Sequence, residues 1–469
     1  MQNSDTPRKP LISGRAAGAA AALVLLVIIS AGLFIYSGNR MRPEPEPVSP
    51  AEEAFALSVY RRENAAQSPA YRDAPELSPW SWKTGAETIS ETAEAARARI
   101  NAGSAILVDA ATGSVLLEKN ADKRIPPASM TKLVAMYTAF HAIENGEISL
   151  DDLVDLPPES WAVNIPPGSS LMFLGRGQRV TVRELLEGMA VVSGNDAAIA
   201  LAYHISGSVP GFVDRMNEEV KKLGLTQTFF TEPSGLSEEN VTTPREFADF
   251  SLVYIRDYPE ALPEFHSLTD FSYPRNWNLP PGTYTAPVRQ QATNRLLGLL
   301  PGCDGLKTGY IDESGYNLAL TCSRGGSRFI SVTMNGPGNG SAEGNKYRIR
   351  DGSLLMEWAF DTFTTVHPGE VTPFPVPVWE GSLNSLILLP AGTSSFTAPS
   401  DRQNLSAIET VVFTPVTAPV YAGQELGRVN YYIDGEIVKS LPLVADRNIR
   451  SAGFVKRIFD RLVRAIAGE

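Results

Sequence analysis

A serine and a lysine three residues apart open the apolar segment PPASMTKLVAMYTAF, residues 126–140. Residues three apart lie on the same face of a helix, so the Ser129 hydroxyl and the Lys132 amine can meet there. A hydroxyl within reach of an amine is the arrangement of a nucleophile and its base. Burial among apolar neighbours would favour the neutral amine, which can accept a proton. The same residues also fit a helix start in which Ser129 is a cap and Lys132 is solvated.

A second motif, Ser193-Gly194-Asn195, interrupts two apolar helical segments. Gly194 permits a tight reversal there, which would present a hydroxyl and an amide to the same cleft. An ordinary helix–helix turn, with Asn195 or the next residue as a cap, explains the same pattern.

A third motif, Lys307-Thr308-Gly309, lies on a predicted strand. Gly309 has no side chain to keep a substrate backbone away, and a lysine beside a hydroxyl can hold a carboxylate. The alternative is an edge strand that carries a protective lysine.

Composition narrows the function classes. The net charge of -11 and the lack of a clustered basic segment argue against nucleic acid as a partner. The histidines are too scattered along the chain to suggest a zinc site, so we expect no metal and no cofactor. They are His141, His204, His266 and His367.

Residues 16–39 contain no charged side chain and are long enough to cross a bilayer. We predict a short cytoplasmic tail over 1–15, an uncleaved transmembrane signal anchor over 16–39 and a proline- and acid-rich spacer over 40–100. A cleaved signal peptide is the alternative, but no small-x-small site follows the apolar run. Everything after the anchor would then lie outside the cytoplasm.

Patterned sequence begins near residue 103 with two predicted strands joined at 111–113. Helices fill the middle of the chain, one of them beginning with a capping box of Thr181 and Glu184. Strands return near residue 303 and are followed by another helix. This order predicts an α+β domain over 101–366, an antiparallel sheet with helices on it and an inserted all-helical lobe.

From 367 to 447, short valine- and proline-rich strands predict a separate small all-β domain. Residues 451–469 then place apolar side chains on one helical face and Lys456, Arg457, Arg461 and Arg464 on the other. This is the pattern of an amphipathic helix on an anionic membrane surface. Packing against the β domain is the alternative.

Serine-x-x-lysine, serine-x-asparagine and lysine-threonine-glycine, in this order and on these elements, are the triple signature of penicillin-binding proteins and serine β-lactamases. With the segments TNRLLG and DGLKTGYIDESGYNLAL, the chain resembles low-molecular-weight penicillin-binding proteins that are D-alanyl-D-alanine carboxypeptidases, over about residues 103–364. The β domain and terminal helix resemble that family too. The resemblance implies a β-lactamase/transpeptidase-like fold.

Carried onto this chain, the resemblance implies that Ser129 attacks the carbonyl between two D-alanines and that Lys132 takes its proton. Ser193 would relay a proton to the leaving amine, and Asn195 would bind the substrate backbone. The backbone amides of Ser129 and Tyr310 would form the oxyanion hole.

The resemblance also implies a cationic site for the terminal carboxylate of the substrate. Lys307, Thr308 and Gly309 would contribute to it, with Arg295 and Arg348 as the candidate arginines. A surface ion pair is the alternative role for either arginine.

Cys303 and Cys322 flank a predicted hairpin with its turn near residues 312–313. Antiparallel pairing about that turn would place the two cysteines opposite each other. We therefore predict a possible disulfide, the alternative being two buried thiols.

The expected partners are peptidoglycan stem peptides, β-lactam antibiotics as covalent inhibitors, and the bacterial cell membrane. Two other functions stay open: a DD-endopeptidase on the same fold, and a membrane-bound sensor or scaffold that is acylated by penicillin without turnover. The chain departs from the family pattern in that it looks anchored at both ends, whereas the resembled enzymes commonly have a cleaved signal peptide.

Overall fold

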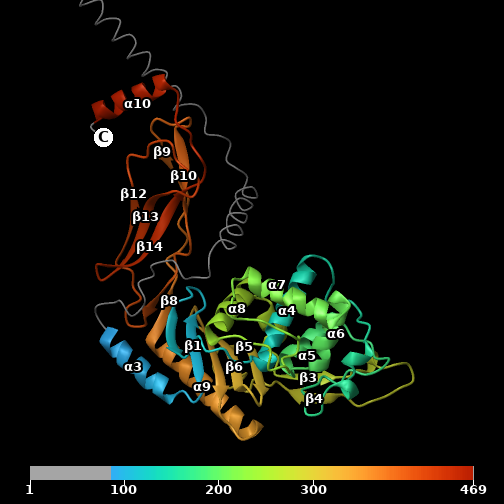
Figure 1. Ribbon diagram of the computed structural model, residues 1–469. Helices are drawn as coiled ribbons and strands as arrows, with labels where there is room; N and C mark the ends of the chain where they lie inside the picture. The colour runs from blue at the N-terminus through green and yellow to red at the C-terminus, as the bar shows by residue number, and fades with distance from the viewer. Residues whose placement is uncertain (1–85, 468–469) are drawn as a thin grey trace, which may run out of the picture. The chain divides into compact units, whose positions relative to one another are not determined.

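The computed structural model describes residues 86–467 (Figure 1). Its peptidase domain is built on an antiparallel five-stranded sheet with the strand order β2-β1-β7-β6-β5. The strands are β1 (Ser104–Asp109), β2 (Val115–Lys119), β5 (Cys303–Ile311), β6 (Gly315–Arg324) and β7 (Ser327–Gly336). The hairpin predicted at 111–113 joins β1 to β2, and β1 also pairs with β7, more than 200 residues away in the chain.

Helices cover both faces of this sheet (Figure 1). Because side chains of a strand alternate between faces, Ala105 and Leu107 pack in one apolar core while Ile106 and Val108 pack in the other. The first core contains residues of α3 (Ala86–Arg99) and α9 (Ser341–Thr362). The second contains residues of α4 (Thr131–Glu144), α5 (Val182–Val191), α6 (Asn195–Ser206), α7 (Val209–Lys222) and α8 (Pro244–Asp257). The predicted α+β class with a helical lobe is confirmed.

Short elements complete the helical lobe. The predicted capping box is present at the start of α5, where Thr181 and Glu184 bond reciprocally. The remaining elements are η2 (Ala128–Met130), η3 (Pro158–Ser160), η4 (Ala162–Asn164), η5 (Leu262–His266), η6 (Asn276–Asn278), β3 (Asp270–Tyr273) and β4 (Val288–Gln291). Of these, η2 directly precedes α4 and contains Ser129, around which the site is built.

Helix α3 lies inside the range that the sequence assigned to an extended spacer. Ala93 and Ala96 are buried, and Ala96 packs in the same core as Ile100. Alanine buries little surface and gives a weak periodic signal, so the sequence did not predict this helix next to the proline- and acid-rich segment. The folded domain thus begins before residue 101. The predicted tail, anchor and the rest of the spacer lie outside the described residues.

A second, all-β domain follows α9, as predicted. Its five-stranded sheet has the order β12-β13-β14-β10-β9, and β8 and β11 form a separate pair. The strands are β8 (Phe363–Val366), β9 (Phe374–Pro377), β10 (Ser385–Pro390), β11 (Phe396–Pro399), β12 (Ala407–Val412), β13 (Glu425–Ile433) and β14 (Glu436–Ala445). The domain has a core of its own, which includes Leu388, Val429 and Leu443.

A buried carboxylate ties the β8–β11 pair to the end of β1. Asp109 accepts hydrogen bonds from the Thr365 and Thr397 hydroxyls at 2.7 and 2.9 Å and from the Ala111 amide at 2.8 Å. Burial raises the pKa of Asp109, although these donors oppose the rise.

The terminal helix α10 (Phe454–Ala467) packs with its polar face inward. Asp460 accepts from the Glu380 amide at 2.7 Å and pairs with Lys456, while Arg461 forms a bidentate pair with the Glu380 carboxylate at 2.9 Å. The apolar face is left exposed to solvent; it consists of Phe454, Val455, Ile458, Leu462 and Ile466. Within residues 86–467, no helix is both long and apolar enough to span a bilayer.

Candidate active site

The site is built around the turn that leads into α4. Ser129 lies in η2, and Lys132 lies in the first turn of α4, where its Nζ is 3.2 Å from the Ser129 Oγ. Ala128 adopts a left-handed conformation with φ 51°, which turns the chain so that Ser129 is partly exposed while Lys132 points inward. The structure therefore brings together the serine and the lysine that the sequence singled out.

Lys132 is completely buried, and its amine is surrounded by oxygen atoms. Besides Ser129 Oγ, it contacts Asn195 Oδ1 at 2.6 Å and the backbone carbonyl oxygen of Ser234. Burial lowers the pKa of Lys132 to about 7, against the opposing charges of Glu232 and Asp196. Near neutral pH a large fraction of this amine is thus unprotonated and able to act as a base.

The second motif faces the same amine, but its backbone differs from the expectation. Ser193 takes the left-handed conformation, with φ 61°, whereas Gly194 has φ -55°. Glycine is needed at 194 for space instead, because a Cβ there would lie 2.8 Å from the Asp196 carboxylate and 3.2 Å from the Met172 amide. The buried Ser193 hydroxyl has no hydrogen-bond partner among the described residues.

Asp196, which the sequence analysis did not select, fixes the segment beside this motif. Its carboxylate accepts hydrogen bonds from the amides of Met172, Phe173 and Leu174 at 2.8–3.0 Å. Phe173 has φ 75°, a conformation that a bulky residue rarely adopts without support. The carboxylate supplies that support from one residue beyond the motif.

The third motif lies on β5, directly against the serine turn. A Cβ at Gly309 would overlap the Pro127 carbonyl oxygen and lie 3.2 Å from the Ser129 amide nitrogen. The missing side chain therefore serves the approach of β5 to the nucleophile, not only access for a substrate backbone. Lys307 is buried next to it, and both burial and the neighbouring cations Lys132 and Arg348 lower its pKa.

The two candidate arginines differ sharply. Arg348 reaches from α9 to the Gly309 carbonyl oxygen, contacts Asn345 at 2.9 Å and lies 4.8 Å from the centre of the Tyr316 ring. Arg295 is exposed, and its guanidinium donates a hydrogen bond to Gln291. Only Arg348 is thus connected to β5 by these contacts.

Tyr310 follows the third motif on β5, and its side chain packs against a second aromatic ring. Its ring stacks on Tyr316 at 4.3 Å between centroids, and its hydroxyl donates to Asp312 at 2.6 Å. From the sequence, only the backbone amide of Tyr310 was expected to take part in the site. The Tyr316 ring thus contacts both the Tyr310 ring and the Arg348 guanidinium.

Two further residues that the sequence analysis missed hold β5 in place. Asn294 is buried and donates to the Gly305 carbonyl at 3.2 Å, which gives the asparagine of TNR a structural contact to this strand. His266 packs beside Gly305 and bonds to the Tyr254 hydroxyl at 2.7 Å. Burial, together with the charge of Lys307, lowers the pKa of His266 to about 3, so this ring is neutral.

Cys303 and Cys322 are directly opposite each other in the pairing of β5 with β6. Both are free thiols in the structure, and Cys322 is buried. The cross-strand position expected from the sequence is thus present.

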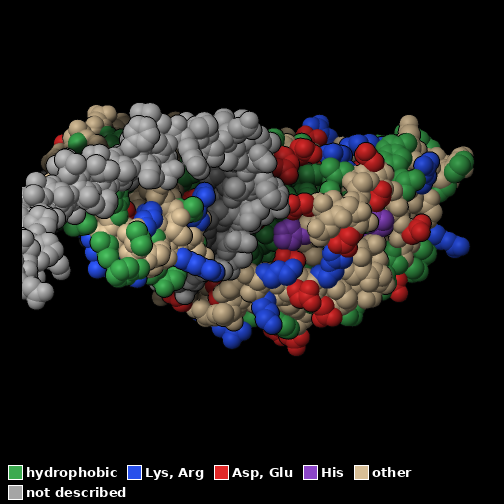
Figure 2. Space-filling model, turned by 90° about the horizontal axis from the view of Figure 1, so that it is seen from above, with side chains coloured by type: hydrophobic (Ala, Val, Ile, Leu, Met, Phe, Trp, Pro, Cys, Tyr) green, Lys and Arg blue, Asp and Glu red, His purple; other side chains and the backbone are tan. Residues whose placement is uncertain are grey.

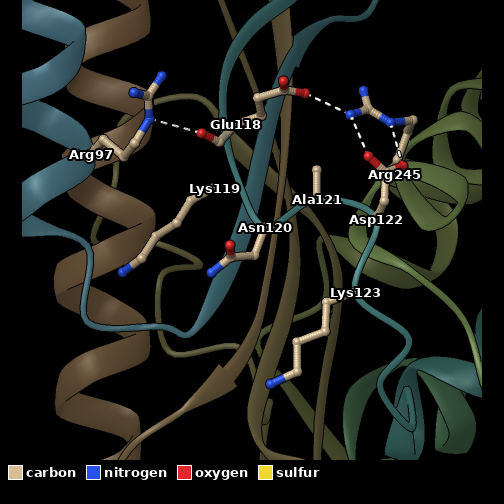
Figure 3. Close-up of a pocket in the computed structure, with 8 residues that line it drawn as sticks. All are labelled: Arg97, Glu118, Lys119, Asn120, Ala121, Asp122, Lys123 and Arg245. Atoms are coloured by element: carbon tan, nitrogen blue, oxygen red, sulfur yellow. Dashed lines mark hydrogen bonds and ion pairs between the residues drawn. The ribbon is translucent and has the colours of Figure 1, made fainter.

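A surface hollow of about 710 Å³ lies elsewhere, beside α3 and the end of β2 (Figure 3). None of the residues that line it belongs to the site described above. Arg245 is paired with Glu118 and Asp122, and Arg97 donates to the Glu118 carbonyl oxygen. Acidic and basic side chains are also interspersed over the surface seen in Figure 2, so the visible face is not a uniform basic surface.

Models of two known domain families match this chain. A model of the D-alanyl-D-alanine carboxypeptidase family matches residues 90–338, and one of the penicillin-binding protein 5 C-terminal domain matches 360–451. The chain is 34% identical over 368 residues to the D-alanyl-D-alanine carboxypeptidase DacC of Escherichia coli, covering 77% of this chain and 87% of the relative. It is 33% identical over 367 residues to DacF of Bacillus subtilis, with 76% and 87% covered.

Solved structures give the same result. Penicillin binding protein 5 from Haemophilus influenzae is similar with a TM-score of 0.63 and 33% identity, covering 75% of this chain and 98% of that one. Penicillin binding protein 6B from Escherichia coli has a TM-score of 0.59 and 30% identity, covering 74% and 96%. The chain therefore belongs to the D-alanyl-D-alanine carboxypeptidase family of serine peptidases, with the C-terminal domain of penicillin-binding protein 5.

Proposed function

We propose that this protein removes the terminal D-alanine from peptidoglycan stem pentapeptides through an acyl-enzyme on Ser129. The observation that carries the proposal is the burial of Lys132 between Ser129 Oγ, Asn195 Oδ1 and the Ser234 carbonyl oxygen. A desolvated amine with a pKa of about 7, 3.2 Å from a serine hydroxyl, is suited to general-base catalysis.

In the first step, neutral Lys132 takes the Ser129 proton while Oγ bonds to the carbonyl carbon between the two D-alanines. The backbone amides of Ser129 and Tyr310 stabilise the negative oxygen of the tetrahedral intermediate. The bond to the leaving nitrogen then breaks, with Ser193 relaying a proton to it, so that D-alanine departs as the free amino acid. Water hydrolyses the remaining ester and restores Ser129.

The free carboxylate of the substrate is bound on the β5 side of the site. Arg348 supplies positive charge there, Lys307 and Thr308 supply hydrogen-bond donors, and Gly309 allows the close approach. Asn195 holds the substrate backbone while its Oδ1 accepts from Lys132. Arg295 has no part in this proposal because its hydrogen bond to Gln291 lies on the surface.

We further propose that the enzyme works on the outer side of the bacterial cell membrane. The apolar face of α10 is exposed, which suits contact with a lipid surface. The same acylation chemistry would make β-lactams covalent inhibitors, because the Ser129 hydroxyl would attack their ring carbonyl. The similar solved structures are named penicillin binding proteins.

The decisive experiment compares the full-length chain with its Ser129→Ala variant. Free D-alanine release from a stem-pentapeptide mimic and covalent labelling by a fluorescent penicillin are measured on both. We expect release and labelling for the natural chain and neither for the variant. Labelling without release would exclude the carboxypeptidase; cleavage of a cross-linked dimer would then identify an endopeptidase, and its absence a sensor.

A further inference from the structure

The segment Glu232–Gly235 lies directly beneath the nucleophile. The Ser234 carbonyl oxygen contacts the Lys132 amine, and Gly235, with φ 87°, is so close to the serine turn that a Cβ would overlap the Ala128 carbonyl. A displacement of this segment would therefore move the Ser234 carbonyl away from Lys132 and also disturb the packing of Gly235 against the turn that carries Ser129.

The Glu232 carboxylate holds this segment in shape. Its Oε2 accepts from the Ser234 amide at 2.7 Å and from the Ser234 hydroxyl at 2.5 Å. Its Oε1 accepts from the Gly235 amide at 2.6 Å and from Asn240 Nδ2 at 2.9 Å. Asn240 in turn reaches Thr131, the residue before Lys132, at 3.2 Å. The Glu232 side chain is thus bonded directly to Ser234 and Gly235 and is linked through Asn240 to the residue before Lys132.

Glu232 also contributes charge. Glu232 from this segment and Asp196 from α6 raise the pKa of Lys132. Lys132 in turn lowers the pKa of Lys307 from β5. Asp196 is committed to four backbone amides, and burial raises its own pKa. Of the two carboxylates that oppose the effect of burial on the Lys132 pKa, Glu232 has the larger effect.

We propose that Glu232 is a positioning residue, which holds the Ser234 carbonyl against the Lys132 amine and whose negative charge sets the pH at which that amine becomes a base. The inference rests on the proposed function, since it assigns a role to Glu232 through Lys132. The sign follows from the charge: the carboxylate stabilises the protonated amine, so its removal lowers the Lys132 pKa further.

The test is the pH dependence of penicillin acylation in the full-length chain and in Glu232→Gln. The acylation rate is expected to rise with pH as Lys132 loses its proton, with a midpoint near pH 7 in the natural chain. Glu232→Gln is expected to lower the plateau rate about tenfold, because the segment loosens, and to move the midpoint about one pH unit lower. The ratio of variant to natural rate must therefore increase toward low pH.

Asn240→Ala is the matched control, because it loosens the same segment without removing a charge. It is expected to lower the rate while leaving the midpoint in place. A Glu232→Gln profile that falls in height but keeps the natural midpoint would reduce Glu232 to a structural role and overturn the proposal. If Glu232→Gln does not fold, Glu232→Asp takes its place: retaining the charge, it must keep the midpoint, and a shift of about one unit would refute the inference. Absence of acylation in the natural chain at every pH would instead refute the proposed function.

Discussion

Lys132 shows how a single side chain acquires its chemistry from its surroundings. In water its amine would be protonated at neutral pH, but complete burial lowers its pKa to about 7. The serine and lysine spacing could be read from the sequence because it is local. The other two oxygen atoms at the amine come from residues 63 and 102 positions away. The motif in the sequence pointed to Asn195, but no local signal identified Ser234.

Lys132→Arg is expected to abolish acylation at every pH, because a guanidinium does not give up its proton. The loss should be about 10²- to 10⁴-fold, the usual contribution of a positioned base. Stopped-flow acylation by a chromogenic β-lactam measures it. The exposed Lys123→Arg variant should behave as the natural chain, and substantial activity in Lys132→Arg at high pH would exclude Lys132 as the base.

The two arginines give a prediction that the sequence could not make. Arg348→Ala should lower kcat/KM for a peptide ending in D-alanyl-D-alanine about 10- to 100-fold, since it removes a cation that lies against Gly309. Arg295→Ala should remain within about twofold, because exposed polar contacts contribute little. Steady-state D-alanine release measures both, and equal losses in the two variants would contradict this distinction.

At the scale of elements, the site depends on how closely β5 and the segment before α8 approach the turn before α4. The hydrophobic pattern of the sequence predicted these strands and helices well, because each has a regular apolar face. It did not reveal the left-handed conformation of Ser193 or the shape of the Glu232 segment. Both are imposed by hydrogen bonds and close packing between distant parts of the chain, which leave no periodic signal.

Gly309→Ala tests the approach of β5. The added methyl group would overlap the Pro127 carbonyl oxygen, so strand and turn must separate. We expect the free energy of unfolding, measured by urea denaturation, to fall by about 1–3 kcal/mol. We also expect the rate of penicillin acylation, measured by labelling, to fall by more than this loss of stability explains. Gly175→Ala is the control, since its Cβ would meet only ordinary contacts at 3.5 Å. Unchanged acylation in Gly309→Ala would show that the approach is not required.

The cysteine pair belongs to the same two strands. Because Cys303 and Cys322 are directly opposite in β5 and β6, we predict that they form a disulfide in an oxidising compartment outside the cytoplasm. Mass spectrometry after alkylation under non-reducing conditions should show two unmodified cysteines, which become alkylated only after reduction. Two alkylated cysteines in the exported protein would contradict the prediction.

At the scale of the whole molecule, the chain combines a peptidase domain, a β domain and a helix whose apolar face is exposed. The order of these parts could be read from composition and periodicity. The orientation of α10 could not, because an amphipathic pattern does not say which face packs on the protein. Here the basic residues Lys456 and Arg461 pair with acidic groups, so they are not all available for anionic lipid headgroups.

Leu462→Asp tests the role of α10 in a chain that begins at Pro43. Leu462 is 58% exposed on the apolar face, and its insertion into lipid should contribute about 1.5–3 kcal/mol. Sedimentation with vesicles should therefore show binding at least about tenfold weaker than in the parent chain. Ile437→Asp, at a 41% exposed position on β14, is the matched control. Equal binding by both variants would exclude lipid contact through this face.

The inward polar face of α10 makes its contact with the β domain and its proposed contact with lipid respond oppositely to salt. Raising the ionic strength screens the Arg461–Glu380 pair, which holds the helix to the β domain. A salt such as sulfate strengthens the burial of the exposed apolar face instead. A salt wash would therefore leave this helix in the lipid while loosening the protein it carries, so the enzyme would become more mobile at the surface before it could be extracted.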